Sequence, residues 1–192
     1  MWIQLATILL FVSCCVSQSR VVNAANKNVH LGSAGDPRRW SLMGKRIVVT
    51  GGTKGIGKAI VEECAEMGAE VYTCARDKST LDLCVAEWEG RGLKVRSCVA
   101  DVSNQLGREA LISFVQHHDE NDHGVDALIN NVGTNIRKRA IEYDEHEYNK
   151  IMTTNLHATF HLTMAMHPLL KQASAKNPKG AAVVNIGSVA GK

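Results

Sequence analysis

A glycine-rich segment has the composition and spacing of a phosphate-binding turn. It reads Thr50-Gly51-Gly52-Thr53-Lys54-Gly55-Ile56-Gly57 and lies between an apolar run and a segment of helical periodicity. Gly51 permits a tight turn, Gly55 has no Cβ to keep a pyrophosphate from the backbone, and Gly57 allows a helix to pack closely on a strand. The start of that helix would offer free N–H groups and a positive dipole end to the phosphates. We therefore predict a dinucleotide site here, with an ordinary glycine-rich turn as the alternative.

Five short apolar runs predict the strands that would hold this turn. They are 46–50, 70–75, 94–100, 126–130 and 181–186, and they are rich in valine and isoleucine. Nearly continuous apolar runs of this length are typical of strands buried on both faces of a sheet.

Residues at helical spacing between these runs predict amphipathic helices. The predicted apolar faces are Ile56, Ile60, Cys64 and Met67 in the first helix, Leu81, Val85 and Trp88 in the second, and Leu106, Ala110, Phe114 and Val115 in the third. Ser79 and Ser103 are predicted to cap the second and third helices, because a hydroxyl there can accept from the unpaired N–H groups.

Alternating strands and helices indicate an α/β fold, a Rossmann-type doubly wound parallel sheet of which about five strands are present. Right-handed crossovers place helices on both faces, and the ligand crevice lies beyond the carboxyl ends of the strands. We expect one partial nucleotide-binding domain over 41–192. Residues 1–24 are expected to form a signal or presequence and residues 25–40 a linker. A short membrane anchor and a misassigned start codon are the alternatives for the first of these segments.

The leader would direct the protein to the secretory pathway or an organelle such as a plastid, with the cytoplasm as the alternative. Its first 16 residues carry no charge, and Val22 and Ala24 offer a Val-x-Ala cleavage site. The run is too short and too often interrupted by polar residues for a membrane-spanning helix. We expect no membrane association of the mature form.

Composition and cysteine spacing exclude several other functions. The chain has 22 Lys and Arg against 19 Asp and Glu, a net charge of +3, and only 5% aromatic residues, which argues against nucleic acid as a partner. No cysteine spacing fits a metal site, and His157 and His161 have no third ligand nearby, so we expect no metal. Cys74 and Cys98 are expected on adjacent strands, where they could oxidise if the protein is exported.

Four ordered motifs resemble the short-chain dehydrogenase/reductase family over residues 40–192. The glycine segment matches that family's T-G-x-x-x-G-x-G hallmark, and Asp101-Val102 matches its adenine-contacting pair. Asn130-Asn131-Val132-Gly133 is similar to the N-N-A-G motif, with valine for alanine. The resemblance implies that Ser188 after the fifth strand is the catalytic serine and that Asn155 is the active-site asparagine supporting a proton-relay water.

Within the family, the segments WSLMGKRIVVTGGTKGIG, VYTCARD, NNVGTNIRK and HPLLKQA resemble tropinone reductase-like enzymes. This resemblance implies an NADPH-dependent carbonyl reductase that acts on a small-molecule ketone or alcohol and assembles as a homo-oligomer when full length. Lys54 and Arg76 could clamp the 2′-phosphate of NADP. Asp77 lies near the position of an NAD-selecting carboxylate, but the family's selecting position is Ala75 here, so we expect NADP rather than NAD.

The resemblance also implies a catalytic tyrosine and lysine that would follow Lys192. The three tyrosines, Tyr72, Tyr143 and Tyr148, all precede Ser188. We therefore expect this chain as given to be inactive, most simply as a fragment or a truncated gene product. Two alternatives remain open: a non-catalytic nucleotide-binding protein that ends at Lys192, and a 3-oxoacyl-type reductase of the same family.

Overall fold

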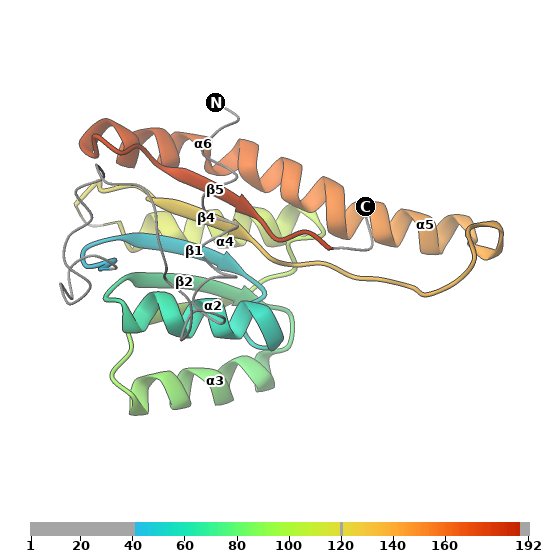
Figure 1. Ribbon diagram of the computed structural model, residues 1–192, viewed down its shortest axis with the longest axis horizontal. Coiled ribbons are helices and arrows are strands. Elements are labelled where there is room, and N and C mark those ends of the chain that lie inside the picture. The colour runs from blue at the N-terminus through green and yellow to red at the C-terminus, as the bar shows by residue number, and fades with distance from the viewer. Residues whose placement is uncertain (1–40, 120, 189–192) are drawn as a thin grey trace, which may run out of the picture.

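The computed structural model describes residues 41–119 and 121–188, which form one five-stranded parallel sheet (Figure 1). The strands are β1 (Arg46–Thr50), β2 (Glu70–Ala75), β3 (Val95–Val99), β4 (Ala127–Asn130) and β5 (Ala182–Asn185). Their order is β3-β2-β1-β4-β5, and every neighbouring pair is parallel. The predicted doubly wound α/β fold is confirmed. The strand order reverses between β1 and β4, the position where such sheets open a crevice at their carboxyl ends.

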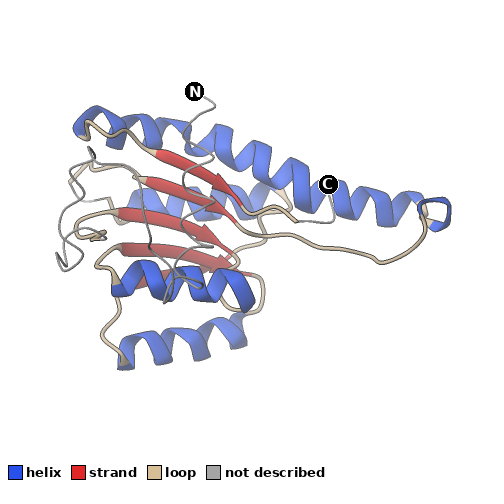
Figure 2. Ribbon diagram, in the orientation of Figure 1, coloured by secondary structure: helices blue, strands red, loops and turns tan. Residues whose placement is uncertain are grey.

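Helices cover both faces of the sheet (Figure 2). Helices α2 (Gly55–Glu66) and α3 (Lys78–Gly90) pack on one face around Val49, Val71 and Trp88. Helices α4 (Gln105–His117) and α6 (Ala158–Lys176) pack on the other face around Val48, Leu128 and Leu162. Helix α5 (Glu145–Met152) continues through a π-helical segment, Thr153–His157, into α6.

Burial of the strands differs between the centre and the edges of the sheet. All five residues of β1 and the last five of β2 are buried, as predicted for strands covered on both faces. The same prediction is wrong for β3 and only partly right for β5, since no β3 residue is fully buried and Val99 is 49% exposed. These two strands lie at the edges of the described sheet, where helices cover them less completely.

The predicted apolar face of α3 is confirmed, since Leu81 and Trp88 are buried and Val85 packs against the core, whereas the faces of α2 and α4 are partly shifted. Ile56 and Leu106 are 59% and 78% exposed, because the next residue in each helix, Gly57 or Gly107, is the one that is buried, and Ala110 is exposed as well. Helix α4 instead contacts the sheet through Gly107, Leu111 and Val115. A side chain at Gly107 would clash with the backbone of Asp101, so this glycine sets how closely the helix approaches.

The residues that cap α3 and α4 differ from the predicted Ser79 and Ser103. Asp77, and not Ser79, caps α3, because its carboxylate accepts a hydrogen bond from Thr80 N at 2.7 Å. Asn104, and not Ser103, caps α4, with its side-chain oxygen 2.8 Å from Gly107 N. In both cases the capping oxygen belongs to the residue that directly precedes the first helical turn.

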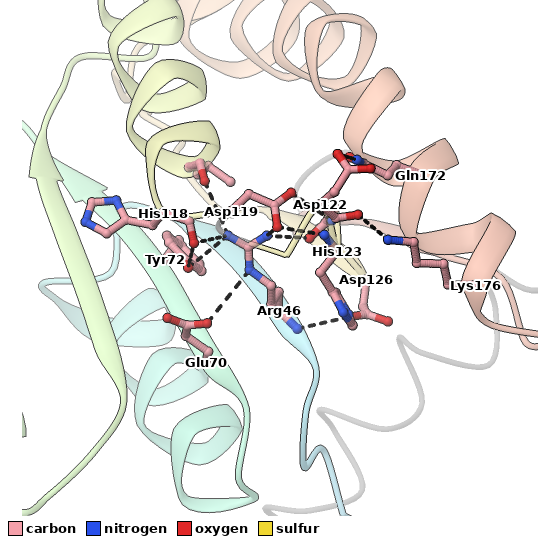
Figure 3. Close-up of polar contacts among 12 residues, drawn as sticks. Arg46, Glu70, Tyr72, His118, Asp119, Asp122, His123, Asp126, Gln172 and Lys176 are labelled. Carbon is pink, nitrogen blue, oxygen red and sulfur yellow. Dashed lines mark hydrogen bonds and ion pairs between the residues drawn. The ribbon is translucent and has the colours of Figure 1, made fainter.

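A buried guanidinium ties the amino end of the sheet together (Figure 3). Arg46 is only 6% exposed, although it opens an otherwise apolar strand. Its Nη2 donates to Tyr72 Oη at 2.9 Å and to His118 O at 3.2 Å, while Nη1 donates to Gly124 O at 3.0 Å and forms an ion pair with Asp119. One side chain therefore joins β1, β2, the end of α4 and the loop before β4, and it satisfies carbonyls that the helix end leaves unpaired.

No helix in the described part of the chain is long and apolar enough to cross a bilayer. The predicted leader 1–24 and linker 25–40 lie outside the described residues.

Candidate functional site

A cavity of about 430 Å³ lies at the carboxyl ends of β1 to β4. Its lining comprises Gly51, Thr53, Lys54, Cys74, Ala75, Arg76, Asp77, Ala100, Asp101, Val102, Asn131, Val132, Gly133, Thr134, Lys150 and Thr154. Most of these residues come from the ends of four neighbouring strands and the loops that follow them, and Lys150 and Thr154 come from the helix after β4. The position agrees with the crevice expected of a doubly wound parallel sheet.

The glycine turn after β1 leaves its backbone open to a ligand. Gly51 and Gly55 have φ of 72° and 52°, a region that favours glycine. Nothing lies within 4 Å of a Cβ built at Gly55, whereas a Cβ at Gly57 would clash with Gly51 O and the side-chain nitrogen of Asn131. The first residue before α2 is Lys54, whose side chain makes no capping hydrogen bond. The helix N-terminus therefore keeps N–H groups for an anion.

Thr50 and Asn131 fasten this turn to the loop after β4. The Thr50 hydroxyl oxygen accepts from the backbone N–H groups of Asn131 at 3.0 Å and Val132 at 3.1 Å. In return, the Asn131 side-chain amide donates to Thr50 O at 2.9 Å and Gly51 O at 3.3 Å. Thr50 is 2% exposed and does not line the cavity, so it positions the two loops.

Two cations and one carboxylate border the cavity near the ends of β1 and β2. Within the described ranges, neither Lys54 nor Arg76 forms an ion pair, and both line the cavity. Asp77 lies beside them, but its Oδ1 accepts from Thr80 N and from the Ser79 hydroxyl. Hydrogen bonds from Thr80 and then Ser79 lower the pKa of Asp77 to about 2. This carboxylate is therefore the N-cap of α3.

The loop after β3 forms another wall of the cavity. The Asp101 carboxylate accepts from Ser103 N at 3.0 Å, and Val102 is buried with 3% of its surface exposed. Ala100 precedes them at the end of the strand and also lines the cavity. The wall combines an apolar surface with one carboxylate, a combination that is typical of small-molecule sites.

Asn155 and Ser188 lie outside this cavity. The Asn155 side chain accepts from Thr134 N and donates to Thr134 O, both at 2.8 Å, and so holds the loop that follows Gly133. Asn155 lies within the π-helical segment, an irregularity that is frequent at functional sites. Ser188 is exposed three residues beyond β5, at the same carboxyl edge of the sheet.

Several residues of the cavity escaped the sequence prediction of the site. They are Cys74, Ala100, Thr134, Lys150 and Thr154, whereas Gly55, Ile56 and Gly57 do not line it. Cys74, Ala100 and Thr134 each adjoin a predicted site segment, so the ends of the strands could have indicated them. Nothing in the spacing indicated Lys150, which comes from a helix far along the chain.

Two cysteine thiols at or near the site lie within the sheet. Cys74 and Cys98 face each other in the register of β2 and β3, as predicted for adjacent strands, and both are free. Burial raises the pKa of Cys74 to about 12 and that of Cys98 to about 11. Burial therefore disfavours the thiolate, which is the nucleophilic form of cysteine.

Over residues 41–119 and 121–188, no group of three or more His, Cys, Asp or Glu side chains is arranged to hold a metal ion. The rings of His157 and His161 have their centroids 6.3 Å apart on an exposed part of the helix.

Comparison with known proteins places this arrangement in a family. A family model described as short chain dehydrogenase matches residues 45–192. A tropinone reductase homolog of Arabidopsis thaliana is 47% identical over 154 residues, covering 80% of this chain and 56% of that protein. A second Arabidopsis thaliana relative, named as a chloroplastic tropinone reductase homolog, is 46% identical over 153 residues, covering 80% of this chain and 45% of its own length.

Among solved structures, the RhlG/NADP active-site complex of Pseudomonas aeruginosa matches with a TM-score of 0.72 and 34% identity, covering 81% of this chain and 59% of that one. This chain spans about half the length of the curated relatives it matches. The family model covers most of the chain, and its matched region contains both the glycine turn and the whole described sheet. The chain therefore belongs to the short chain dehydrogenase family.

Proposed function

We propose that this chain binds NADP(H) in the cavity at the carboxyl edge of the sheet and is the cofactor-binding part of a reductase for small-molecule ketones. The observation that carries the proposal is the glycine turn, which lines the cavity through Gly51, Thr53 and Lys54. Its backbone is open at Gly55, beside a helix N-terminus with no side-chain cap from Lys54. The names of the relatives, tropinone reductase homologs, support a carbonyl substrate, and the NADP complex of the solved neighbour supports the coenzyme.

The residues present fit such a coenzyme. The N–H groups between Gly51 and Gly57 would hold the pyrophosphate, and Asp101 with Val102 would flank the adenine. Asn131, Val132 and Gly133 line the same cavity from the β4 side and would contact the ribose-phosphate part. When bound, the nicotinamide coenzyme supplies or accepts the hydride.

Charge supports NADP over NAD. Lys54 and Arg76 present two cations to the cavity, and a 2′-phosphate would form charge-assisted hydrogen bonds with them worth about 1.5–3 kcal/mol each. At the position where the family carries a carboxylate that selects NAD by binding its free 2′-hydroxyl, this chain has Ala75. Asp77 is committed to its bonds with Thr80 and Ser79.

On the substrate side, Ser188 would donate its hydroxyl proton in a hydrogen bond to the carbonyl oxygen and orient it. Asn155 would act as a positioning residue through its hydrogen bonds to Thr134. The tyrosine that would donate the proton, and the lysine that would tune its pKa, are expected after Lys192. Reduction by the complete protein is part of this proposal.

Nucleotide binding can be tested on the chain itself by isothermal titration with NADPH and NADH. We expect saturable binding that is tighter for NADPH. In Gly55→Asp, a carboxylate would occupy the phosphate position, and binding should weaken at least about tenfold because like charges repel. Gly92→Asp is the matched control, since Gly92 has φ of 68°, has open space where a Cβ would lie, and does not line the cavity. Absence of binding to either coenzyme by the folded wild-type chain would overturn the proposal.

We also propose that the full-length protein is a homo-oligomer that pairs through helix α6. Leu156, Phe160 and Met164 follow one another at four-residue spacing and are 53%, 58% and 62% exposed. From residue 151 to 170 the sequence has no Asp, Glu, Lys or Arg. A second copy can pack on such a face without repulsion between like charges.

For the N-terminal 24 residues we propose a targeting role, supported by their apolar, uncharged first part and by a relative named as chloroplastic. A fusion of residues 1–40 to a fluorescent reporter should enter the secretory pathway or an organelle. Purely cytosolic fluorescence would contradict this.

A further inference from the structure

Lys150, in the last turn of α5, lines the cavity together with residues from the sequence motifs. We propose that Lys150 is a further cofactor-binding residue whose ammonium group binds a phosphate of the adenosine half of the nucleotide. This inference rests on the function proposed above. It assigns a role to a helix that lies far along the chain from the glycine turn.

More basic than acidic side chains line the cavity. Its lining holds three cations, Lys54, Arg76 and Lys150, and two carboxylates, Asp77 and Asp101. Both carboxylates already accept backbone N–H bonds, from Thr80 and Ser103 respectively. In the part of the chain that the structure describes, no ion pair neutralises Lys150. An anionic ligand would therefore meet three unpaired cations.

Two basic residues earlier in the same region, Lys138 and Arg139, differ from Lys150 in that both form ion pairs. Lys138 pairs with Glu147, and Arg139 pairs with Glu142, so both charges are balanced within the same region. Neither residue lines the cavity. Among the described residues, Lys150 thus differs from Lys138 and Arg139 in two ways: it forms no ion pair, and it lines the cavity.

Local structure fixes where Lys150 lies. Helix α5 begins with a capping box in which Asp144 accepts from Glu147 N at 2.7 Å and Glu147 accepts from Asp144 N. One turn after Lys150, Thr154 also lines the cavity, and Asn155 is doubly hydrogen-bonded to Thr134. Figure 1 shows α5 extending past the carboxyl ends of the strands. The helix is therefore held against the loop after β4 with Lys150 on the cavity side.

The composition of the cavity indicates which part of the ligand Lys150 would meet. Arg76, Asp101 and Val102, assigned above to the 2′-phosphate and the adenine, share the cavity with Lys150, whereas Ile56 and Ser188 do not line it. A lysine ammonium is a compact charge on a flexible stem and suits a phosphate better than an adenine ring. The 2′-phosphate and the 5′-phosphate are the two sources of that charge in this half of the molecule.

The test compares Lys150→Gln with the wild-type chain by isothermal titration with NADPH, 2′,5′-ADP, AMP and adenosine. We expect affinity for NADPH and 2′,5′-ADP to fall about tenfold, as loss of one charge-assisted hydrogen bond predicts, with adenosine unaffected. Weaker AMP binding would assign Lys150 to the 5′-phosphate, and unchanged AMP binding would assign it to the 2′-phosphate. Lys150→Arg should retain most of the affinity, and the salt dependence of NADPH binding should be shallower in Lys150→Gln.

Lys179→Gln is the matched control, because Lys179 is exposed before β5 and lies outside the cavity. Equal NADPH and 2′,5′-ADP affinity of Lys150→Gln and wild type would overturn the inference while leaving the proposed function intact. An equal loss for adenosine would also overturn it, since that would show a structural effect on the pocket. No nucleotide binding by the wild-type chain would instead overturn the proposed function and the inference together.

Discussion

At the scale of single residues, Asp77 shows how a side chain's local bonds decide its role. By position it could select NAD, yet its carboxylate caps α3 through Thr80 N at 2.7 Å. A carboxylate that satisfies a helix N-terminus and holds a pKa of about 2 stays charged but is turned toward its own helix. The neighbouring Arg76, which has no such bond, is left to face the cavity.

We expect Arg76→Gln to weaken NADPH binding about tenfold and to leave NADH binding nearly unchanged. The guanidinium would contact only the 2′-phosphate, and its loss removes one charge-assisted bond from one coenzyme. Titration of both coenzymes measures the selectivity directly. Arg137→Gln is the control, as Arg137 is an exposed basic residue outside the cavity. A parallel loss for both coenzymes would show that Arg76 does not read the 2′-phosphate.

At the scale of the elements, buried polar groups join the amino ends of the strands just as the glycine turn organises the carboxyl ends. Asp126, directly before β4, accepts hydrogen bonds from Lys45 Nζ at 2.8 Å and from the backbone N–H of Arg46 at 3.0 Å, and its carboxylate lies 3.0 Å from His123 Nε2. Strands β1 and β4 are neighbours in the sheet but are not consecutive in the sequence. Together with the Arg46 guanidinium, these contacts hold their amino ends together (Figure 3).

This arrangement predicts a pH dependence of stability. Burial raises the pKa of Asp126, but hydrogen bonds from Lys45, Arg46 N and His123 outweigh it and hold the pKa below the ordinary 3.8. The folded protein therefore favours the charged carboxylate more than the unfolded chain does. The stabilisation is complete above pH 3.8 and is lost as the pH falls through the lower folded pKa.

Urea unfolding at a series of pH values should show this in Asp126→Asn. We expect the variant to be less stable than wild type at neutral pH and the difference to shrink as the pH falls below 3.8. Asp82→Asn, at an exposed carboxylate that pairs with Lys78, should change stability little at any pH. A difference between Asp126→Asn and wild type that stays constant with pH would contradict the role given to this carboxylate.

At the scale of the whole molecule, the long α5–α6 helix separates two kinds of surface. One side of α6 packs on the sheet through Leu162, Met166 and Leu170. Leu156 in the π-helical segment and Phe160 and Met164 in α6 are exposed instead, and no described element covers them. The helix that carries Lys150 to the cavity thus also carries the face proposed for pairing between copies.

Phe160→Glu should shift the full-length protein toward the monomer, because a charge placed between two copies of an apolar face must be desolvated. Light scattering after size-exclusion chromatography measures the mass. Leu83→Glu is the control, since Leu83 is 74% exposed on α3, away from α6. The same mass for Phe160→Glu, Leu83→Glu and wild type would exclude this face as the interface.

The sequence by itself determined the strands, the alternation with helices and the glycine turn. These features can be predicted because each is specified by a short stretch of sequence. A strand shows as a run of valine and isoleucine, a helix as apolar residues at helical spacing, and the turn as glycines between a strand and a helix. The bounds of β1 and β2 were predicted to the residue, and the sheet order followed the expected doubly wound pattern. Motif positions also led to most of the residues that line the cavity from β1, β2, β3 and β4.

Only the tertiary structure decided which residues meet across these elements. Arg46 reads as one polar residue before an apolar run, and its burial depends on Tyr72, Asp119 and Gly124 from three other segments. Lys150 reads as a surface lysine, and its place in the cavity depends on how the helix after β4 lies against the carboxyl edge of the sheet. Local patterns cannot fix such encounters, because they are set by crossovers and packing between segments distant in sequence.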